Sequence, residues 1–246
     1  MTETPAATSL ARPSSLAWVL STSLLAGAFA AHILYIFLAT PSAQEAAGGV
    51  AQKILYFHAP SAYAFYLGGA ACFLASAIYL VKPSPKADAW AQAGAEVALL
   101  FGMMVLTSGP LWGKKAWGFY WTWDPRLTTM LLSVLLYAAM LIFRRYVGHG
   151  EAERRFAAAF GVLGTVLLPI IHYAVRLWGG NHPTVIGKGG GGLGAAEMKW
   201  ALSAGFLTMT GLALLLLALR ARSALLESRL LEAEEELLAR QEFDEA

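Results

Sequence analysis

The sequence predicts an all-α, polytopic membrane protein with six transmembrane helices. Hydrophobic residues make up 57% of the 246-residue chain and charged residues only 14%, whereas soluble domains carry about 25% charged residues. The apolar residues also gather in six long segments, each near the roughly 20 residues with which a helix spans the hydrocarbon core. A helix satisfies its own backbone polar groups, which lipid cannot do.

The six predicted spans belong to one membrane domain, residues 1–246. Each is long enough to cross as a helix, the fourth only just. In chain order they are Leu16–Ala39, Ser61–Val81, Ala91–Leu111, Leu127–Phe143, Phe156–Leu177 and Trp200–Leu219. After the sixth span, leucine, glutamate and arginine recur at helical spacing. We therefore expect the sixth helix to continue as a charged cytoplasmic tail over residues 220–246.

The first span is predicted to be a retained anchor. Its apolar run, Leu16–Ala39, is longer than the roughly 7–15 residues of a signal-peptide core. Arg12 is the only basic residue before it, and Pro41-Ser42-Ala43 is a poor cleavage signal. We expect this segment to stay in the membrane as the first helix.

The orientation follows from the distribution of Lys and Arg, which favour the cytoplasmic side of short loops. Of the 18 basic residues, 11 fall on one side of the predicted topology and 7 on the other. The link from Arg144 to Arg155 alone contains four arginines. This link and both termini are therefore predicted to be cytoplasmic.

Composition also excludes several classes of function. The net charge is only +2 and no long basic run occurs, so nucleic acid is not an expected partner. The single cysteine, Cys72, rules out a disulfide framework and lies in an apolar run, where we expect it to pack in the core. The glycine run from Gly187 to Gly194 lacks the spacing of a phosphate-binding loop and predicts a flexible linker.

Three loops then face outward: residues 40–60, 112–126 and 178–199. They contain His58, His182 and four of the eight tryptophans, the latter within twelve residues. The cytoplasmic links hold mainly prolines, arginines and one histidine, His149. The residues capable of binding a ligand are therefore expected on the outer side of the membrane.

The outer loop between the third and fourth spans is unusually aromatic. Its tryptophans are Trp112, Trp117, Trp121 and Trp123. On a helical turn Trp117, Tyr120 and Trp121 would share one face, while Gly113 and Gly118 would let a flat ligand approach closely. Tryptophans also gather at any membrane interface. Four of them with two glycines and an acid exceed what such a belt requires.

Asp124 and Pro125 predict the start of the fourth helix. Aspartate is a preferred N-cap residue and proline a preferred first helical residue. The cap would aim the positive end of the helix dipole, together with Arg126, at the outer surface. An anionic group would bind well there.

The aromatic loop resembles the WWD signature of the haem-handling proteins of cytochrome c maturation, a family with CcmC, CcmF and CcsA types. Its continuation Arg126-Leu127-Thr128 is similar to that of the CcmC type. The stretch Gln52–Ala62 resembles the CcmC segment that carries the first haem-ligand histidine. The chain length and the six spans fit the CcmC type. The chain is too short for the larger CcmF and CcsA types. The resemblance covers most of residues 16–219.

The resemblance implies that the chain binds haem at the extracytoplasmic surface of the bacterial cytoplasmic (inner) membrane. His58 and His182 would be the two axial ligands of the iron, a stable six-coordinate arrangement. The haem would be b-type and held non-covalently and transiently. The other expected haem contacts are Trp112, Trp117, Trp121, Trp123, Asp124 and, near the propionates, Arg126.

The resemblance further implies a haem-handling subunit rather than an enzyme. Such a subunit would deliver haem to a periplasmic haem chaperone of the CcmE type. It would act alongside an ABC-type complex of CcmA and CcmB and the small CcmD subunit. Membrane lipid would surround its spans.

Three alternatives remain open on the sequence alone. A haem–apocytochrome c synthase component of the CcsA or CcmF type goes with a larger chain and further histidines. A membrane b-type cytochrome would use His32 and His172, which lie inside the first and fifth spans, where ionisable groups are costly. A plain structural subunit would bind no haem.

Overall fold

The structure, a computed structural model, describes residues 15–44, 48–147, 150–180, 182 and 193–244. Within these residues the chain forms six α-helices and one short 3-10 helix, and all six α-helices are long and apolar enough to cross a membrane. The elements are α1 (Ser15–Leu38), η2 (Gly49–Ile54), α2 (Leu55–Val81), α3 (Pro85–Trp117), α4 (Pro125–Tyr146), α5 (Glu151–Trp178) and α6 (Ala196–Asp244). The predicted all-α, six-span fold is confirmed. His149 and most of the glycine run lie outside the described residues.

Several helices are longer than the apolar segments that predicted them. α2 begins at Leu55, six residues before the predicted start at Ser61. α3 begins at Pro85 because Ser84 caps it: the Ser84 hydroxyl accepts from the Ala87 amide at 3.2 Å. The ends of a helix depend on such polar caps. A count of apolar residues does not detect them.

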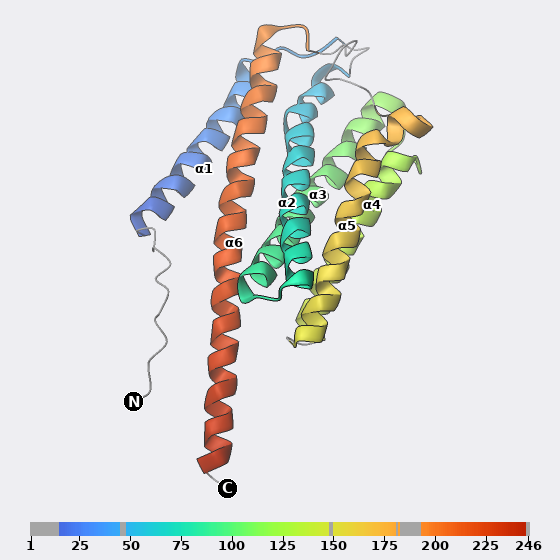
Figure 1. The fold of residues 1–246 in the computed structure, drawn as a ribbon. Coiled ribbons are helices and arrows are strands. Elements are labelled where there is room, and N and C mark those ends of the chain that lie inside the picture. The colour runs from blue at the N-terminus through green and yellow to red at the C-terminus, as the bar shows by residue number, and fades with distance from the viewer. Residues whose placement is uncertain (1–14, 45–47, 148–149, 181, 183–192, 245–246) are drawn as a thin grey trace.

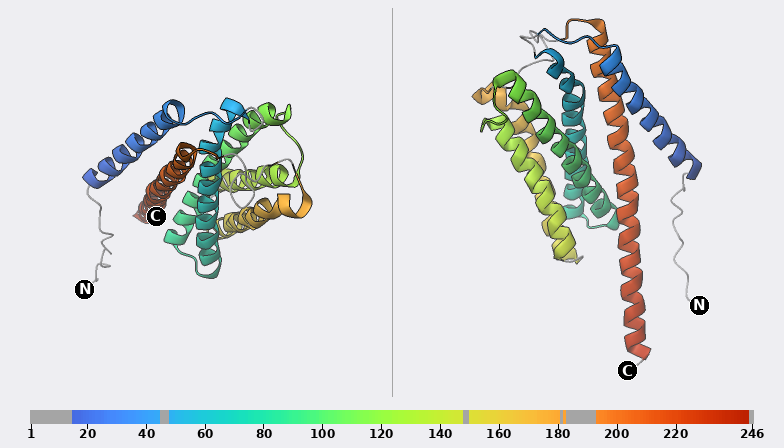
Figure 2. Two further views of the ribbon diagram at one scale, coloured as in Figure 1. Left: turned by 90° about the horizontal axis from the view of Figure 1, so that it is seen from above. Right: turned by 180° about the vertical axis from the view of Figure 1, so that it is seen from behind.

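α1 lies at the edge of the bundle (Figures 1 and 2), whereas α6 packs against α2 and α3. Along its length α1 packs mainly against α6, and many of its apolar side chains are exposed, among them Leu20, Leu24 and Leu34. α6 continues without a break to Asp244, well past the ends of its neighbours (Figure 1). An apolar exposed surface of this kind is expected of a helix that faces lipid.

α2 and α3 form the centre of the bundle because glycines let their backbones meet. A Cβ atom at Gly68 would lie only 2.6 Å from the Ala98 amide nitrogen, and one at Gly94 would overlap the backbone of Cys72. Small residues allow this close approach between membrane helices, where van der Waals packing is a main source of association. Any larger side chain at these positions forces the two helices apart.

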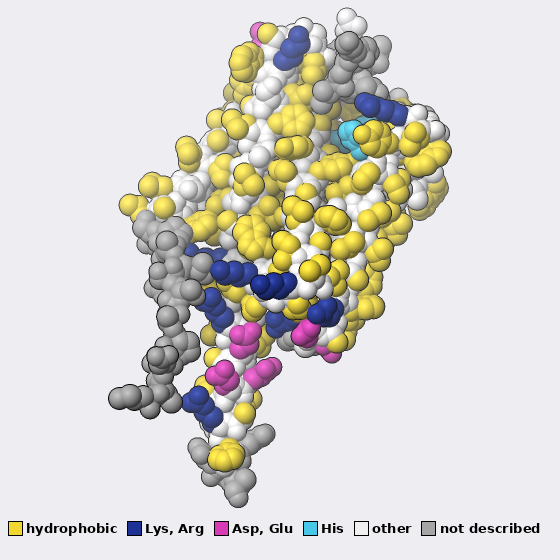
Figure 3. Space-filling model, viewed as in Figure 1, with side chains coloured by type: hydrophobic (Ala, Val, Ile, Leu, Met, Phe, Trp, Pro, Cys, Tyr) yellow, Lys and Arg dark blue, Asp and Glu magenta, His cyan; other side chains and the backbone are white. Residues whose placement is uncertain are grey.

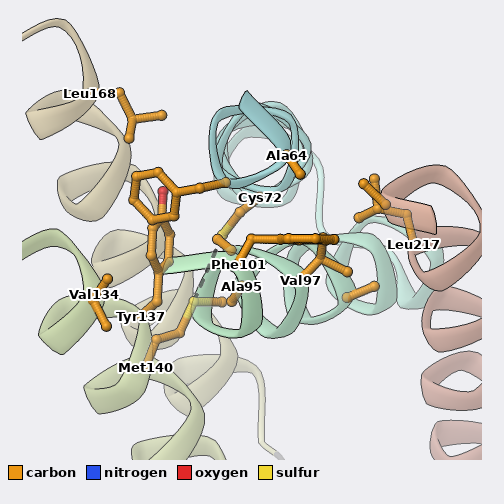
Figure 4. Packing of buried hydrophobic residues seen from close by; sticks show 14 of the residues in the cluster. Ala64, Cys72, Ala95, Val97, Phe101, Val134, Tyr137, Met140, Leu168 and Leu217 are labelled. Carbon is orange, nitrogen blue, oxygen red and sulfur yellow. Dashed lines mark hydrogen bonds between the residues drawn. The ribbon is translucent and has the colours of Figure 1, made fainter. Parts of the chain in front are cut away.

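The core lies where α2, α3, α4 and α5 meet, and it extends to Leu217 on α6 (Figure 4). Phe65, Phe101 and Tyr137 are fully buried there, with the Phe65 and Tyr137 rings edge to face. Cys72 is buried beside Met140, with 3.9 Å between their sulfur atoms. The expectation that Cys72 is a packing residue is confirmed.

Charged side chains gather at the end of the bundle where α1 starts and the α2–α3 and α4–α5 links lie (Figure 3). Asp88 on α3 accepts two hydrogen bonds from Arg144 on α4, at 2.5 and 2.7 Å. Deeper in α3, Glu96 forms an ion pair with Arg220 on α6. These pairs tie α3 at this end to α4 and α6. The histidines and tryptophans of interest lie at the opposite end.

Candidate functional site

The predicted site residues come together at the end of the bundle where α2 and α4 begin and α3 and α5 end (Figure 1). Because these helices alternate in direction, residues far apart in sequence meet there. The structure brings His58, Arg126 and His182 into one group. The tryptophans lie beside this group in two separate pairs.

His58 is the fourth residue of α2, one turn below the helix start, and not in a loop as the sequence predicted. Its Nδ1 lies 2.9 Å from the Ser108 hydroxyl oxygen on α3. That hydroxyl donates its own proton to the Met104 carbonyl at 2.6 Å, so its oxygen accepts from Nδ1–H of His58. A neutral His58 therefore carries its lone pair on Nε2, the arrangement that suits a metal ligand.

α3 approaches His58 closely because of a second small residue. A Cβ atom at Gly109 would lie 3.1 Å from Cε1 of the His58 ring. Ser108 and Gly109 together fix the position of the ring. Neither was among the predicted site residues, and their only signal in the sequence is a Ser-Gly pair near the end of an apolar run.

His182 is held by Arg126. The Arg126 Nη1 donates to His182 Nδ1 at 3.0 Å. Because a guanidinium can only donate, Nδ1 of His182 is the acceptor. The same guanidinium donates through Nε to the Ile171 carbonyl and through Nη2 to the His172 carbonyl, both at 3.1 Å. α5 therefore anchors Arg126, and Arg126 anchors His182.

The rings of His58 and His182 lie at a distance suited to a shared metal. Their centroids lie 6.2 Å apart and their planes are inclined by 32°. Two imidazoles on opposite sides of one metal ion place their nitrogens about 4 Å apart, given metal–nitrogen bonds of about 2.0 Å. The ring centres then lie somewhat farther apart. The observed pair meets this requirement.

Among the described residues no three His, Cys, Asp or Glu side chains are placed to hold a metal ion. The pair can supply two ligands, and a bound molecule could supply the others. In a six-coordinate haem the porphyrin supplies four ligands in a plane, and two histidines bind the iron from opposite faces. The residues present fit such a group.

Asp124 caps α4, as the sequence predicted. Its Oδ1 accepts from the Leu127 amide at 2.9 Å, with Pro125 as the first helical residue. Oδ2 accepts from the Thr122 hydroxyl at 3.2 Å. A Cβ atom at Gly180 would lie 3.6 Å from this carboxylate, so the cap also lies beside the segment that leads to His182.

We expect Asp124→Ala to destabilise the start of α4 by about 1 kcal/mol, the usual contribution of an N-cap. Asp124→Asn keeps a capping oxygen and should lose only a small part of this. The check is the free energy of unfolding of both variants in mixed micelles. Equal losses in the two variants would mean that the negative charge, and not the cap, is what stabilises this end.

The predicted helical face of Trp117, Tyr120 and Trp121 is wrong. α3 ends at Trp117 because Gly118 takes φ +85° and its amide closes the helix on the Lys114 carbonyl. Left-handed glycines commonly end helices in this way. Trp112 and Trp117 therefore lie in the last turns of α3, and residues 118–124 are not helical.

The four tryptophans instead form two edge-to-face pairs. Trp112 and Trp117 have ring centroids 5.2 Å apart, and Trp121 and Trp123 have theirs 5.7 Å apart. Trp112 also lies against Gly48, just before η2 and His58: a Cβ atom there would be 3.4 Å from the indole nitrogen. One pair thus adjoins the segment of His58, and the other continues into the Asp124 cap.

The two intramembrane histidines contact different helices. His32 on α1 is buried, with Nε2 2.9 Å from the Ala201 carbonyl on α6. His172 on α5 is exposed, with its ring against Tyr66 on α2. The structure does not bring these two rings together as one pair of axial ligands.

Comparison with known proteins identifies the family. The sequence profile of the family described as CcmC, heme exporter protein C, matches residues 3–236. The chain belongs to the heme exporter protein C family. This confirms the resemblance carried by the WWD segment and by the stretch around His58.

Individual relatives are similar over different lengths. The chain is 35% identical over 144 residues to heme exporter protein C of Bradyrhizobium diazoefficiens, covering 58% of this chain and 55% of that protein. It is 36% identical over 138 residues to heme exporter protein C of Escherichia coli K12, covering 54% and 55%. In both cases the chain spans about half the length of the relative. A third, from Paracoccus denitrificans, is 28% identical over 198 residues, covering 80% and 81%.

Proposed function

We propose that this chain binds haem between His58 and His182 and passes it to a partner during cytochrome c maturation. The observation that carries the proposal is the imidazole pair, whose ring centroids lie 6.2 Å apart. A porphyrin supplies the equatorial ligands of iron, and the two imidazoles supply the axial ones. Membership of the heme exporter protein C family supports haem as the ligand.

Arg126 is the group that would receive the haem propionates. A guanidinium pairs well with a carboxylate because two N–H groups fit its two oxygens. Arg126 now donates to His182, so a propionate that takes over this guanidinium also releases the His182 ring for iron. Asp124 acts as the cap that aims the α4 N-terminus at the same place.

The haem would be b-type, bound non-covalently and only transiently. Attachment through a thioether bond would need a cysteine, and the only one, Cys72, is buried among α2, α3 and α4. The chain would therefore present haem as a handling subunit without catalysing its attachment. The proposed recipient is a CcmE-type chaperone, with CcmA, CcmB and a CcmD-type subunit as partners in the membrane.

The site would face the periplasm and both termini the cytoplasm. The band of basic side chains at the opposite end of the bundle supports this orientation (Figure 3). Cys72 is buried, so an added cysteine can report the side. In intact cells a membrane-impermeant maleimide should label Ala116→Cys and not Lys86→Cys. The reverse pattern would place the site in the cytoplasm and end the proposal.

The experiment that tests haem binding is a titration of the purified protein, followed by absorption spectroscopy. We expect a low-spin, bis-histidine spectrum. Trp123→Ala should weaken haem affinity roughly tenfold, since the residue is 76% exposed and covering its ring with a porphyrin buries apolar area that contributes about 1–2 kcal/mol.

Trp178→Ala is the matched control for this variant. Trp178 is also an exposed tryptophan at this end of the bundle, at the end of α5, and the residue is 60% exposed. Trp178 lies outside the aromatic loop, so the Trp178→Ala variant should bind haem with the affinity of the unmodified chain. An equal loss of haem affinity in the two variants would mean that the loop tryptophans are only part of an aromatic belt at the membrane interface.

A further inference from the structure

His172 is an exposed ionisable residue on a helix that can span the membrane. It lies six residues before the end of α5 at Trp178, about 9 Å below that end at 1.5 Å per residue. Half of the hydrocarbon core is about 15 Å thick, so the ring lies within the leaflet nearest the proposed haem site. Polar groups facing lipid are costly and are usually retained for a function.

The surroundings of His172 do not explain it as a structural residue. Among the described residues its ring makes two edge-on contacts, with Tyr66 at 6.5 Å and Tyr173 at 4.9 Å between centroids, and no hydrogen bond. Neither ring nitrogen is occupied by these contacts. An imidazole in this position is available to a ligand that approaches through the bilayer.

Arg176 lies one turn nearer the end of the helix and on the same face as His172. Residues four apart in an α-helix are neighbours on its surface, and both side chains are exposed. On the face drawn in Figure 3, histidine and basic side chains gather near the upper end of α5 among apolar side chains. α5 thus presents a nitrogen donor below a cation on an apolar surface.

This arrangement matches one kind of membrane-soluble ligand. Haem is a flat apolar ring with two carboxylates on one edge, so in a bilayer its ring lies among the acyl chains and its carboxylates lie toward the headgroups. Arg176 would bind a carboxylate at the interface, and His172 would meet the iron deeper in the same leaflet. We infer that His172 and Arg176 form a first binding site for haem arriving laterally from the bilayer.

Arg126 connects this first site to the imidazole pair. Its guanidinium donates both to the His172 carbonyl and to the His182 ring. One side chain therefore contacts the backbone of the lipid-facing residue and the ring of a proposed axial ligand. A haem whose carboxylate leaves Arg176 finds Arg126 next, on the way to His58 and His182. The inference rests on the proposed function and adds the route to it.

The first test isolates the proposed lateral site. In vesicles of phosphatidylcholine, the variant His58→Ala/His182→Ala should still bind haem weakly, with a five-coordinate, high-spin spectrum. Adding His172→Ala should remove this signal. A residual signal that survives the third substitution would overturn the lateral site, and full low-spin occupancy in the double variant would overturn the proposed axial ligands instead.

The second test follows haem transfer from haem-loaded phosphatidylcholine vesicles to the protein by stopped-flow absorbance. His172→Ala and Arg176→Gln should each slow the appearance of the low-spin spectrum about tenfold, as expected for the loss of one interaction of about 1.4 kcal/mol. The final spectrum should be unchanged. With the dimethyl ester of haem, which has no free carboxylate, Arg176→Gln should no longer slow transfer.

Leu177→Ala is the matched control, because Leu177 is exposed at a similar depth of α5 but on another face. The Leu177→Ala variant should take up haem from the vesicles at the rate of the unmodified protein. Unchanged rates in His172→Ala and Arg176→Gln would overturn the inference, as would equal slowing by Leu177→Ala. Loss of the final low-spin spectrum in His172→Ala would instead make His172 an axial ligand and contradict the proposed pair.

Discussion

Replacing His58 with alanine is expected to abolish the six-coordinate, low-spin haem spectrum and to weaken haem binding by roughly a hundredfold or more. Loss of an outer-shell partner of a metal ligand already costs about 10–100-fold, and here the ligand itself is removed. His58 is also the member of the pair whose Nε2 is prepared for iron by the Ser108 hydrogen bond. Absorption and electron paramagnetic resonance spectra of the loaded protein measure the change.

Two further variants show whether the effect belongs to ligation. Ser108→Ala keeps the ligand but removes its partner, so binding should weaken about 10–100-fold with the low-spin spectrum retained. His32→Ala removes a buried histidine that contacts α6 and should leave the spectrum intact. A low-spin spectrum that persists without His58 and disappears without His32 would favour the b-type cytochrome alternative.

His182→Ala should also yield a high-spin spectrum, but for a different structural reason. In the haem-free protein Arg126 already occupies Nδ1 of His182. Iron binding at this ring therefore requires Arg126 to move, whereas His58 needs no rearrangement. We expect the first iron–histidine bond to form at His58 and the second at His182.

The membrane fold could be read from the sequence because its cause is local. Each span needs only a run of apolar residues of sufficient length, and six such runs are present. The polar ends of the helices could not be placed in the same way. Ser84 and Gly118 fix the two ends of α3 through a side-chain cap and a left-handed backbone, which apolar counting does not detect.

The site could be predicted in part. His58, His182 and Arg126 were singled out from motif context, and the structure brings them together. Ser108 and Gly109 were missed because their roles depend on how α3 crosses α2, which no local pattern encodes. The prediction of a helical aromatic face was wrong for a similar reason, because Gly118 ends α3 before Tyr120 and Trp121.

Asp88→Ala is expected to cause the largest loss of stability among the substitutions considered. The Asp88 side chain is only 8% exposed and pairs with Arg144 at 2.5 Å and with Arg154 at 3.7 Å. Removing one member of a buried ion pair costs about 3–5 kcal/mol, because the remaining charge stays buried without compensation. Here two arginines from α4 and α5 would lose the same carboxylate.

Glu151→Ala provides the matched control at the same end of the bundle. Glu151 pairs with Arg155 at 2.9 Å, but its side chain is 64% exposed, and an exposed pair four residues apart contributes only about 0.3–0.5 kcal/mol. Denaturation of both variants with sodium dodecyl sulfate in mixed micelles measures the difference. Losses within about 0.5 kcal/mol of each other would show that solvent, and not the arginines, compensates Asp88.

The same variant separates stability from haem binding. Asp88 and Ser108 are twenty residues apart on α3, which places them about 30 Å apart along the helix. Asp88→Ala should therefore unfold at a lower detergent fraction yet keep the low-spin haem spectrum while it is folded. If the spectrum changed together with stability, the ion pairs at one end of α3 would be coupled to the position of Ser108 and His58 at the other.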